Sequence, residues 1–262
     1  MLKISPIIKS LLIVAIALKI IVLNHSLAHS RQPPSTVTQL DKTALPLLAN
    51  NTDRTTISYS RTAAFTEYKP QYGSVEIHPS NYGDRYSVDA YGKPLNNQPL
   101  VVLHETTDSA SSAINTFRTN HPHDNNQVSY HALITLDGTI IYLVPSNKRA
   151  FGAGNSAFKS RNGTEAVRTN PNLPASVNNF AYHISLETPL DGRGKDNRNY
   201  HSGYTQEQYK SLAWLIALSD IPEERITTHK DVDLDQHKKD PRSFDLDKLL
   251  IILNSYRQPI SN

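Results

Sequence analysis

The stretch that decides the fold is "PLVVLHE", from Pro99 to Glu105. Residues 100–103 are four consecutive apolar residues, a run typical of a strand that is buried on both faces. His104 follows this run directly and places an imidazole at the end of the strand. In α/β proteins, the ends of sheet strands are where binding and catalytic groups gather. The stretch therefore predicts a central strand with a chemically useful side chain at its rim.

The segments around this strand alternate between helical and extended patterns. Asp108 is a plausible cap for the first helix, and Thr205 with Gln208 has the pattern of a capping box for the second. In chain order after the strand, we expect a helix over 109–119, a hairpin over 130–144 that turns at Asp137-Gly138, a strand over 180–188, a helix over 205–218, a short strand over 224–229 and a helix over 244–256. This order predicts an α/β fold with a mixed central β-sheet flanked by helices.

The first 28 residues read as a targeting segment. Lys3 and Lys9 precede an apolar run over 11–18, and Ser26-Leu27-Ala28 ends the segment with small residues. This pattern is typical of a secretory signal peptide, while an uncleaved N-terminal anchor is the alternative. Lys19 interrupts the apolar run and makes a complete membrane span the weaker reading. We therefore expect an exported protein, periplasmic or extracellular, that contacts a membrane only if residues 1–28 stay attached.

Composition suggests how the rest of the chain is divided. Residues 29–70 are rich in Pro, Ser, Thr, Asn and Gln and predict a polar linker. A folded domain is expected over 71–257, and 258–262 form a tail.

Charge and cysteine content exclude two classes of protein. All basic residues of the first 28 are lysines without an acidic counterpart, and they account for the formal net charge of +3. The remaining chain is formally neutral and offers no basic surface for nucleic acid. There are no cysteines, so a disulfide framework is impossible and any metal site must use His and carboxylate ligands.

Two histidines stand at predicted strand ends, and a carboxylate follows one of them. His104 ends the first strand, His229 ends the strand over 224–229, and Asp240 precedes Pro241 in the following loop. Two imidazoles and one carboxylate leave a fourth position of Zn²⁺ for water, which is the arrangement of a catalytic zinc site. The alternative is that each is an ordinary polar residue at a sheet edge.

Other histidines and acids compete for the same role. His121 and His123 lie in a polar loop and are expected to be solvated, whereas His237 could replace Asp240 as a ligand. Asp231, Asp233 and Asp235 alternate along the loop, but a calcium loop would need a glycine at its sharp turn, and none is present.

Four segments together resemble a known family. They are "PLVVLHET", "VSYHALITLDGTIIYLVPSNKRAFGAG", "FAYHISLE" and "THKDVDLDQHKKDP". In combination they resemble the type 2 zinc-dependent N-acetylmuramoyl-L-alanine amidases, which share a fold with peptidoglycan recognition proteins and phage lysozyme-type amidases. The resemblance implies that His104, His229 and Asp240 are zinc ligands. It also matches Lys238 to a lysine two residues before the third ligand and Tyr130 to a tyrosine beside the metal, and it implies that these two residues stabilise the oxyanion.

The sequence departs from this family at Ser185, where the bacterial cytoplasmic branch has a glutamate that is proposed as general base. Side chains alternate along a strand, so His183, Ser185 and Glu187 are expected on one face. Glu187 is therefore a candidate substitute base, and the alternative is that Tyr130 and Lys238 suffice. Glu105 is expected to point to the opposite face from His104 and to be structural. A serine-hydrolase triad on this strand is disfavoured, because a nucleophile usually occupies a sharp turn.

The resemblance implies hydrolysis of the amide bond between N-acetylmuramic acid and L-alanine in peptidoglycan, with Zn²⁺ as cofactor and muropeptides as substrates. Two alternatives stay open: a non-catalytic muropeptide-binding module of the same fold, and a zinc peptidase that cuts within the stem peptide. Arg149 and Phe151 are candidates for the substrate groove or, equally, a turn residue and a small core aromatic.

Overall fold

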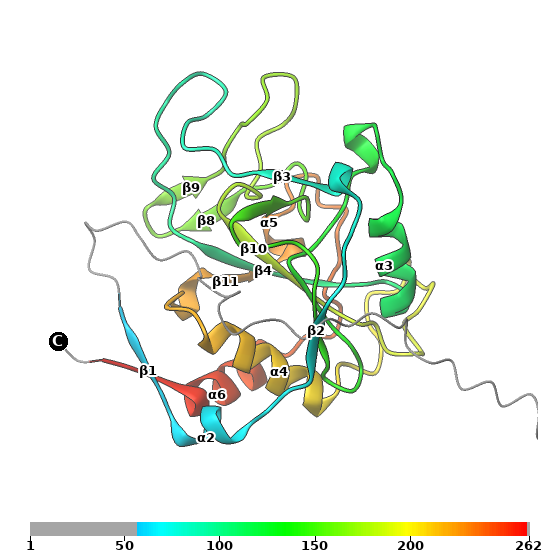
Figure 1. Ribbon diagram of the computed structural model, residues 1–262, viewed down its shortest axis with the longest axis vertical. Helices are drawn as coiled ribbons and strands as arrows, with labels where there is room; N and C mark the ends of the chain where they lie inside the picture. Colours follow the sequence, from blue (N-terminus) through cyan, green and yellow to red (C-terminus); the bar gives the residue numbers. More distant parts are fainter. Residues whose placement is uncertain (1–56, 261–262) are drawn as a thin grey trace, which may run out of the picture. The chain divides into compact units, whose positions relative to one another are not determined.

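A six-stranded mixed sheet lies at the centre of the computed structural model, which describes residues 57–260 (Figure 1). Its strands, in order across the sheet, are β11 (Ile226–Thr228), β4 (Leu100–Glu105), β10 (Ala181–Leu186), β5 (Ala132–Ile134), β6 (Ile140–Tyr142) and β2 (Tyr72–Ser74). The β5 and β6 pair is antiparallel, and the other neighbours are parallel. The predicted mixed α/β sheet is therefore confirmed.

Helices and shorter strands surround this sheet. The α-helices are α2 (Ala63–Glu67), α3 (Ala110–Arg118), α4 (Gln206–Ala217), α5 (His229–Val232) and α6 (Leu246–Tyr256). Three strand pairs lie outside the main sheet: β1 (Tyr59–Arg61) with β12 (Arg257–Pro259), β3 (Tyr82–Asp84) with β7 (Lys148–Ala150), and β8 (Phe158–Ser160) with β9 (Gly163–Glu165). The 3₁₀ turns are η1 (Pro79–Asn81), η2 (Asp124–Asn126) and η3 (Glu223–Arg225).

The two faces of the sheet have different coverings. Val101 and Leu103 of β4 pack with α4 and α6 in one core, on the lower side of the sheet in Figure 1. Val102, between them in sequence, belongs to a second core made with the loops around β8, and Leu133 of β5 packs against α3. His104 shares the face of Val102, because side chains alternate along a strand. The face that carries His104 is thus covered by α3 and loops.

Local sequence signals explain where several elements begin. Thr205 and Gln208 form the predicted capping box, with the Thr205 Oγ1 accepting from the Gln208 amide and the Gln208 side chain accepting from the Thr205 amide. The β5–β6 turn uses Gly138 at φ +84°, a conformation that a residue with a Cβ rarely adopts. The cap of α3 differs from expectation, since Ser109, not Asp108, accepts the hydrogen bond from the Ser112 amide at 3.2 Å.

The boundary of the folded domain also differs from expectation. Residues 57–70 were predicted as the end of a polar linker, but β1 pairs with β12, and α2 packs on α6. Phe65 of α2 stacks on Trp214 with ring centroids 5.5 Å apart. The prediction failed because this short segment has no hydrophobic period of its own and depends on a distant partner. The predicted leader over 1–28 and the first part of the linker lie outside the described residues.

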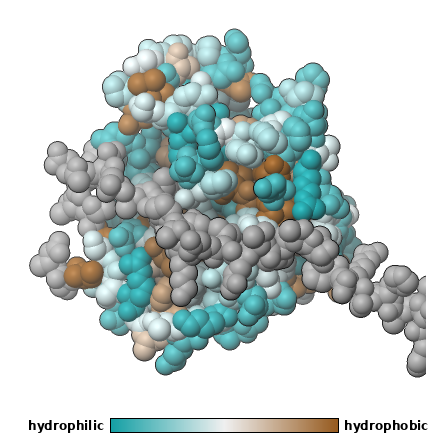
Figure 2. Space-filling view, viewed as in Figure 1, coloured by the Kyte–Doolittle hydropathy of each residue, from teal (hydrophilic) through white to brown (hydrophobic). Residues whose placement is uncertain are grey.

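The surface of this domain is mixed in character. Figure 2 shows a face that is mostly hydrophilic, with smaller hydrophobic areas between. Among residues 57–260, none of the helices combines the length and the apolar character needed to cross a bilayer.

Replacing Phe65 tests whether α2 is an integral part of the fold. We expect Phe65→Ala to lower the free energy of unfolding by roughly 1–3 kcal/mol, because it removes a half-buried ring and its stacking on Trp214. Urea denaturation followed by circular dichroism measures this change. Tyr91→Ala is the matched control, since Tyr91 is 73% exposed and should leave stability unchanged. Equal stability of the Phe65 variant and the wild type would show that α2 does not support the domain.

Candidate metal centre

Three predicted ligands, far apart in sequence, meet at one edge of the sheet. The Nδ1 atom of His104 lies 3.3 Å from an oxygen of Asp240, and the Nδ1 atom of His229 lies 3.0 Å from the same carboxylate. One possible ligand atom from each residue lies within 4.8 Å of the other two. Strand register explains the meeting, because Thr228 of β11 pairs with Leu103 of β4, so that His229 comes next to His104.

The three donors fit a zinc ion. Tetrahedral Zn²⁺ with bonds of about 2.0–2.1 Å places its ligand atoms about 3.3 Å apart, close to the two spacings around Asp240. Two imidazole nitrogens with one carboxylate also form one of the known ligand sets of catalytic zinc. The structure thus brings the predicted ligands together in a suitable arrangement, while zinc itself stays a prediction.

The protonation states of this cluster suit a cation. Burial lowers the pKa of His104 to about 4, so its imidazole is neutral and keeps a lone pair at neutral pH. Burial opposes ionisation of Asp240, but hydrogen bonds from His104 and His229 outweigh it and hold the pKa of the carboxyl well below its usual range. The cluster therefore presents one negative charge and neutral nitrogen at a buried position.

Backbone contacts hold the loop that carries Asp240. The carbonyl oxygen of Asp240 accepts from the Lys230 amide at 3.0 Å and ties the loop back to α5. Asp233 accepts from the amides of His237 and Lys238 at 2.7 and 2.8 Å and closes the intervening turn. Asp233 therefore stabilises this turn through its side chain.

Tyr130 lies beside the cluster, where the family resemblance places it. Its ring stacks on the His104 imidazole with centroids 4.6 Å apart, and Phe117 of α3 supports it edge-on at 5.4 Å. Burial, followed by the charge of Asp240, raises the pKa of Tyr130 well above its ordinary value. The hydroxyl therefore stays protonated and can act as a hydrogen-bond donor.

Lys238 lies on the exposed side of the same cluster. Burial and the neighbouring cluster residues have the larger effects on the pKa of His104, and the positive charge of Lys238 lowers it further. The ammonium group is therefore close enough to influence the site. A flexible exposed lysine can place this charge beside a ligand.

Glu187, the candidate base, is held by other groups. One carboxylate oxygen accepts from the Ala110 amide at 3.0 Å and from Arg193 Nη2 at 2.7 Å. The other oxygen accepts from the Leu136 amide at 3.0 Å. These contacts join α3, the β5–β6 turn and the loop after β10, and they make Glu187 a structural anchor instead of the free base that strand alternation allowed.

Glu105 has the structural role expected from its position on the opposite face. Its carboxylate accepts from His201 Nε2 and from the Tyr204 hydroxyl, each at 2.9 Å, and it pairs with Arg242. Arg242 in turn donates to the carbonyl oxygens of Gly192 and Lys195. This buried network fixes the residues next to His104 and Asp240.

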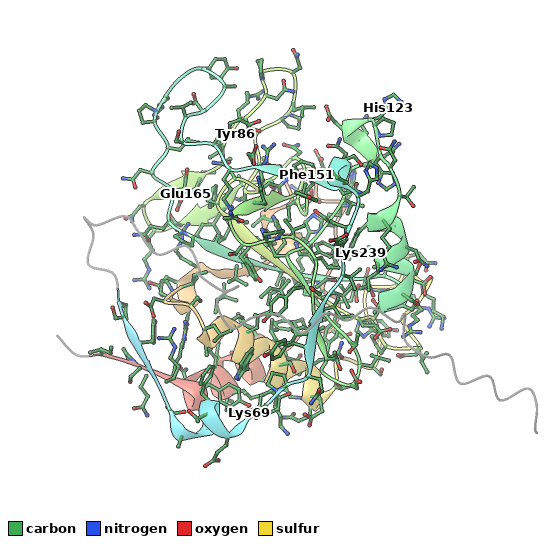
Figure 3. The ribbon with its side chains drawn as sticks, in the orientation of Figure 1. Lys69, Tyr86, His123, Phe151, Glu165 and Lys239 are labelled. Atoms are coloured by element: carbon green, nitrogen blue, oxygen red, sulfur yellow. The ribbon has the colours of Figure 1, made fainter. Side chains whose placement is uncertain are left out.

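The rival histidines do not join the metal cluster. His121 Nδ1 contacts Asn81 at 2.9 Å, while His123 and His237 are exposed. Figure 3 shows His123 near the tip of the segment that follows α3. His123 is therefore exposed, as expected, whereas His121 is half-buried, and His237 does not replace Asp240.

Arg149 and Phe151 belong to a stack of side chains next to β3 and β7. The Arg149 guanidinium lies 5.0 Å from the Tyr86 ring centroid and 5.2 Å from that of Phe151. Figure 3 shows Tyr86 and Phe151 on the side of the sheet away from Lys69, that is, away from α2. Both residues stay candidates for the substrate groove.

Sequence reasoning missed one contact partner of the cluster. His183 Nδ1 lies 2.9 Å from His104 Nε2, and both side chains are fully buried. The signal available was the predicted shared face of His183 and Ser185, and register places Ser185 opposite His104. Among the described residues, the Ser185 hydroxyl has no hydrogen-bond partner.

Comparison with known proteins bears directly on this site. A family model described as N-acetylmuramoyl-L-alanine amidase matches residues 95–243, which include all three clustered ligands. No match is found among curated proteins.

Several solved structures are similar to the chain. A selenomethionine derivative of AmpD has 25% identity and a TM-score of 0.48, covering 71% of this chain and 96% of that chain. The endolysin amidase LysCS from Clostridium intestinale URNW has 20% identity and a TM-score of 0.44, covering 71% and 97%. The E. coli amidase AmiD, solved with an anhydro-N-acetylmuramic acid peptide substrate, has 21% identity and a TM-score of 0.46, covering 66% and 65%.

The family match extends over more than half of the chain and contains the whole candidate metal centre. The chain therefore belongs to the N-acetylmuramoyl-L-alanine amidase family and is an enzyme that hydrolyses the amide bond between N-acetylmuramic acid and L-alanine in peptidoglycan.

Proposed function

We propose that the chain carries out this amide hydrolysis as a zinc enzyme, with Zn²⁺ held by His104, His229 and Asp240. The observation that carries the proposal is the meeting of two imidazole nitrogens and one carboxylate at zinc-compatible spacing. When bound, zinc supplies a Lewis acid that polarises a carbonyl group and lowers the pKa of water to about 7. Substrates of this site are peptidoglycan strands or muropeptides.

In this proposal, two residues stabilise the negative charge that develops on the oxygen of the scissile carbonyl. The Tyr130 hydroxyl remains protonated and donates a hydrogen bond toward the carbonyl oxygen as negative charge grows on it. Lys238 brings a positive charge from the exposed side of the cluster. Together these groups stabilise the oxyanion. Because Glu187 is already held by its own contacts, we assign the chemistry to Tyr130 and Lys238 rather than to Glu187.

Export is also part of the proposal. The apolar segment with flanking lysines at residues 1–28 supports secretion to the compartment that holds peptidoglycan. The polar residues that follow, up to the start of β1, would give the domain reach toward its substrate.

Loss of each ligand tests the metal assignment. We expect His104→Ala, His229→Ala and Asp240→Ala each to abolish zinc retention, because each removes one of three protein donors. Metal analysis of the purified protein after dialysis measures the retained zinc. His237→Ala is the control and should retain zinc fully, since His237 is exposed and outside the cluster. Full occupancy in Asp240→Ala would refute the assignment.

Removal of the metal tests the reaction itself. We expect treatment with a strong chelator to stop hydrolysis of muropeptides and added Zn²⁺ to restore it, because in this proposal zinc is the group that activates water and polarises the carbonyl. Mass spectrometry of the products gives the bond that is cut. Free stem peptide with unsubstituted glycan agrees with the amidase. A cut within the peptide, or intact muropeptide retained on the protein, would contradict it.

The role of Glu187 is tested by a change that removes only its charge. We expect Glu187→Gln to lower the free energy of unfolding by roughly 1–3 kcal/mol, because it weakens the pair with Arg193 and the bonds to two backbone amides. Its turnover should fall by less than about tenfold when measured well below the unfolding temperature. Arg193→Gln is the matched control, with a similar loss of stability. A fall in turnover of about 10²-fold or more with unchanged stability would instead identify Glu187 as the general base.

A further inference from the structure

A second imidazole touches the zinc ligand His104 inside the protein. His183 Nδ1 lies 2.9 Å from His104 Nε2, and neither residue has any exposed surface. The other nitrogen of His104, Nδ1, faces Asp240. We propose that His183 is a positioning residue for His104, which holds the ligand in the orientation and tautomer that leave Nδ1 free for zinc. This inference rests on the proposed zinc site.

The proton count at this contact supports the assignment. A neutral imidazole carries one N–H, so a histidine that binds metal through Nδ1 must carry its proton on Nε2. That proton requires an acceptor, because metal-binding histidines nearly always donate their second nitrogen to a neighbouring group. The Nδ1 atom of His183, 2.9 Å away, is the acceptor in this proposal, which places the His183 proton on Nε2, a buried atom without a hydrogen-bond partner among the described residues.

The backbone of His183 is itself held on both sides by His131. The His131 amide donates to the His183 carbonyl oxygen at 2.9 Å, and the His183 amide donates to His131 Nδ1 at 2.9 Å. Since His131 Nδ1 accepts, its proton lies on Nε2, which is 3.1 Å from the Lys148 carbonyl oxygen. His131 therefore contacts the His183 backbone through both its amide and its ring, and it fixes the position from which the His183 ring reaches His104.

Gly152 provides the space that the His183 ring occupies. A Cβ atom at residue 152 would lie 2.4 Å from His183 Nδ1 and 2.5 Å from its Cγ, closer than real Cβ contacts allow. The backbone of Gly152 is not in the left-handed region, so its conformation alone does not demand glycine. The requirement comes from the imidazole. Gly152 and His183 thus act as a pair, because the missing side chain at residue 152 leaves the space that the His183 ring fills.

The pair makes a quantitative prediction for metal affinity in the full chain. We expect His183→Ala to raise the zinc dissociation constant by about 10–100-fold, as for loss of other groups that orient a metal ligand. Gly152→Ala should weaken zinc binding in the same range, because its methyl group displaces the His183 ring. The double variant should bind no more weakly than His183→Ala alone, since Gly152 acts through His183. Competition against a chromophoric chelator measures all four dissociation constants.

Two further measurements separate positioning from general damage to the fold. His183→Asn, whose side-chain oxygen can accept from His104 Nε2, should recover most of the lost affinity. The visible absorption spectrum of the Co²⁺-loaded protein should change in His183→Ala and return toward the wild type in His183→Asn. His123→Ala is the control for loss of an exposed histidine and should leave affinity and spectrum unchanged.

The outcomes are distinct from those that test the zinc site itself. If the wild type binds zinc and His183→Ala binds it equally tightly, the positioning role is overturned while the proposed function stands. If the wild type binds no zinc, both fail. Should His183→Ala not fold, Gly152→Ala decides alone, because undiminished zinc affinity with a displaced ring contradicts the inference. Additive losses in the double variant would overturn the coupling of Gly152 to His183.

Discussion

The buried carboxylate of Asp240, approached by two imidazoles, is the interaction on which the rest of the site depends. The contacts of this carboxylate with the imidazoles of His104 and His229 outweigh the cost of burial and hold its pKa well below the usual range. His104 lies in β4 and His229 directly follows the parallel neighbouring strand β11, so the sheet register sets their separation. The loop that brings Asp240 to them is closed by Asp233 and tied to α5. The negative charge of Asp240, the neutral nitrogen of His104 and the fixed geometry of the ligands thus all result from one local arrangement.

Two other carboxylates near the site have a different use. Glu105 is paired with Arg242 and accepts from His201 and Tyr204, whereas Glu187 is paired with Arg193 and accepts from two backbone amides. Each of these acids joins segments that are distant in sequence. Buried charges of this kind need such partners, because an unpaired carboxylate in the interior is costly. Their contacts explain why acidic residues close to a metal centre need not take part in its chemistry.

The histidines also divide into classes that composition alone does not separate. Some are exposed, such as His123, and two meet at Asp240. His183 and His131 lie behind the ligands, where they have no access to solvent and contact one another through ring and backbone. In this place an imidazole is useful as a hydrogen-bonding group of defined tautomer, and Gly152 provides the room for it. The part of this sheet face next to the ligands therefore carries polar side chains whose orientations depend on one another.

The amino-acid sequence by itself determined the local elements and the candidate ligands. The apolar run before His104, the capping box at Thr205 and the turn at Gly138 depend on neighbours in the chain, and these predictions agree with the structure. Tertiary structure alone decided the use of Glu187, the contact of His183 with His104 and the packing of α2 on α6. These features rest on partners far away in sequence: His183 meets a residue 79 positions earlier, and Glu187 meets an amide 77 positions earlier. Periodicity and spacing describe which face a side chain occupies, but only the folded chain determines which distant atom completes its hydrogen bond.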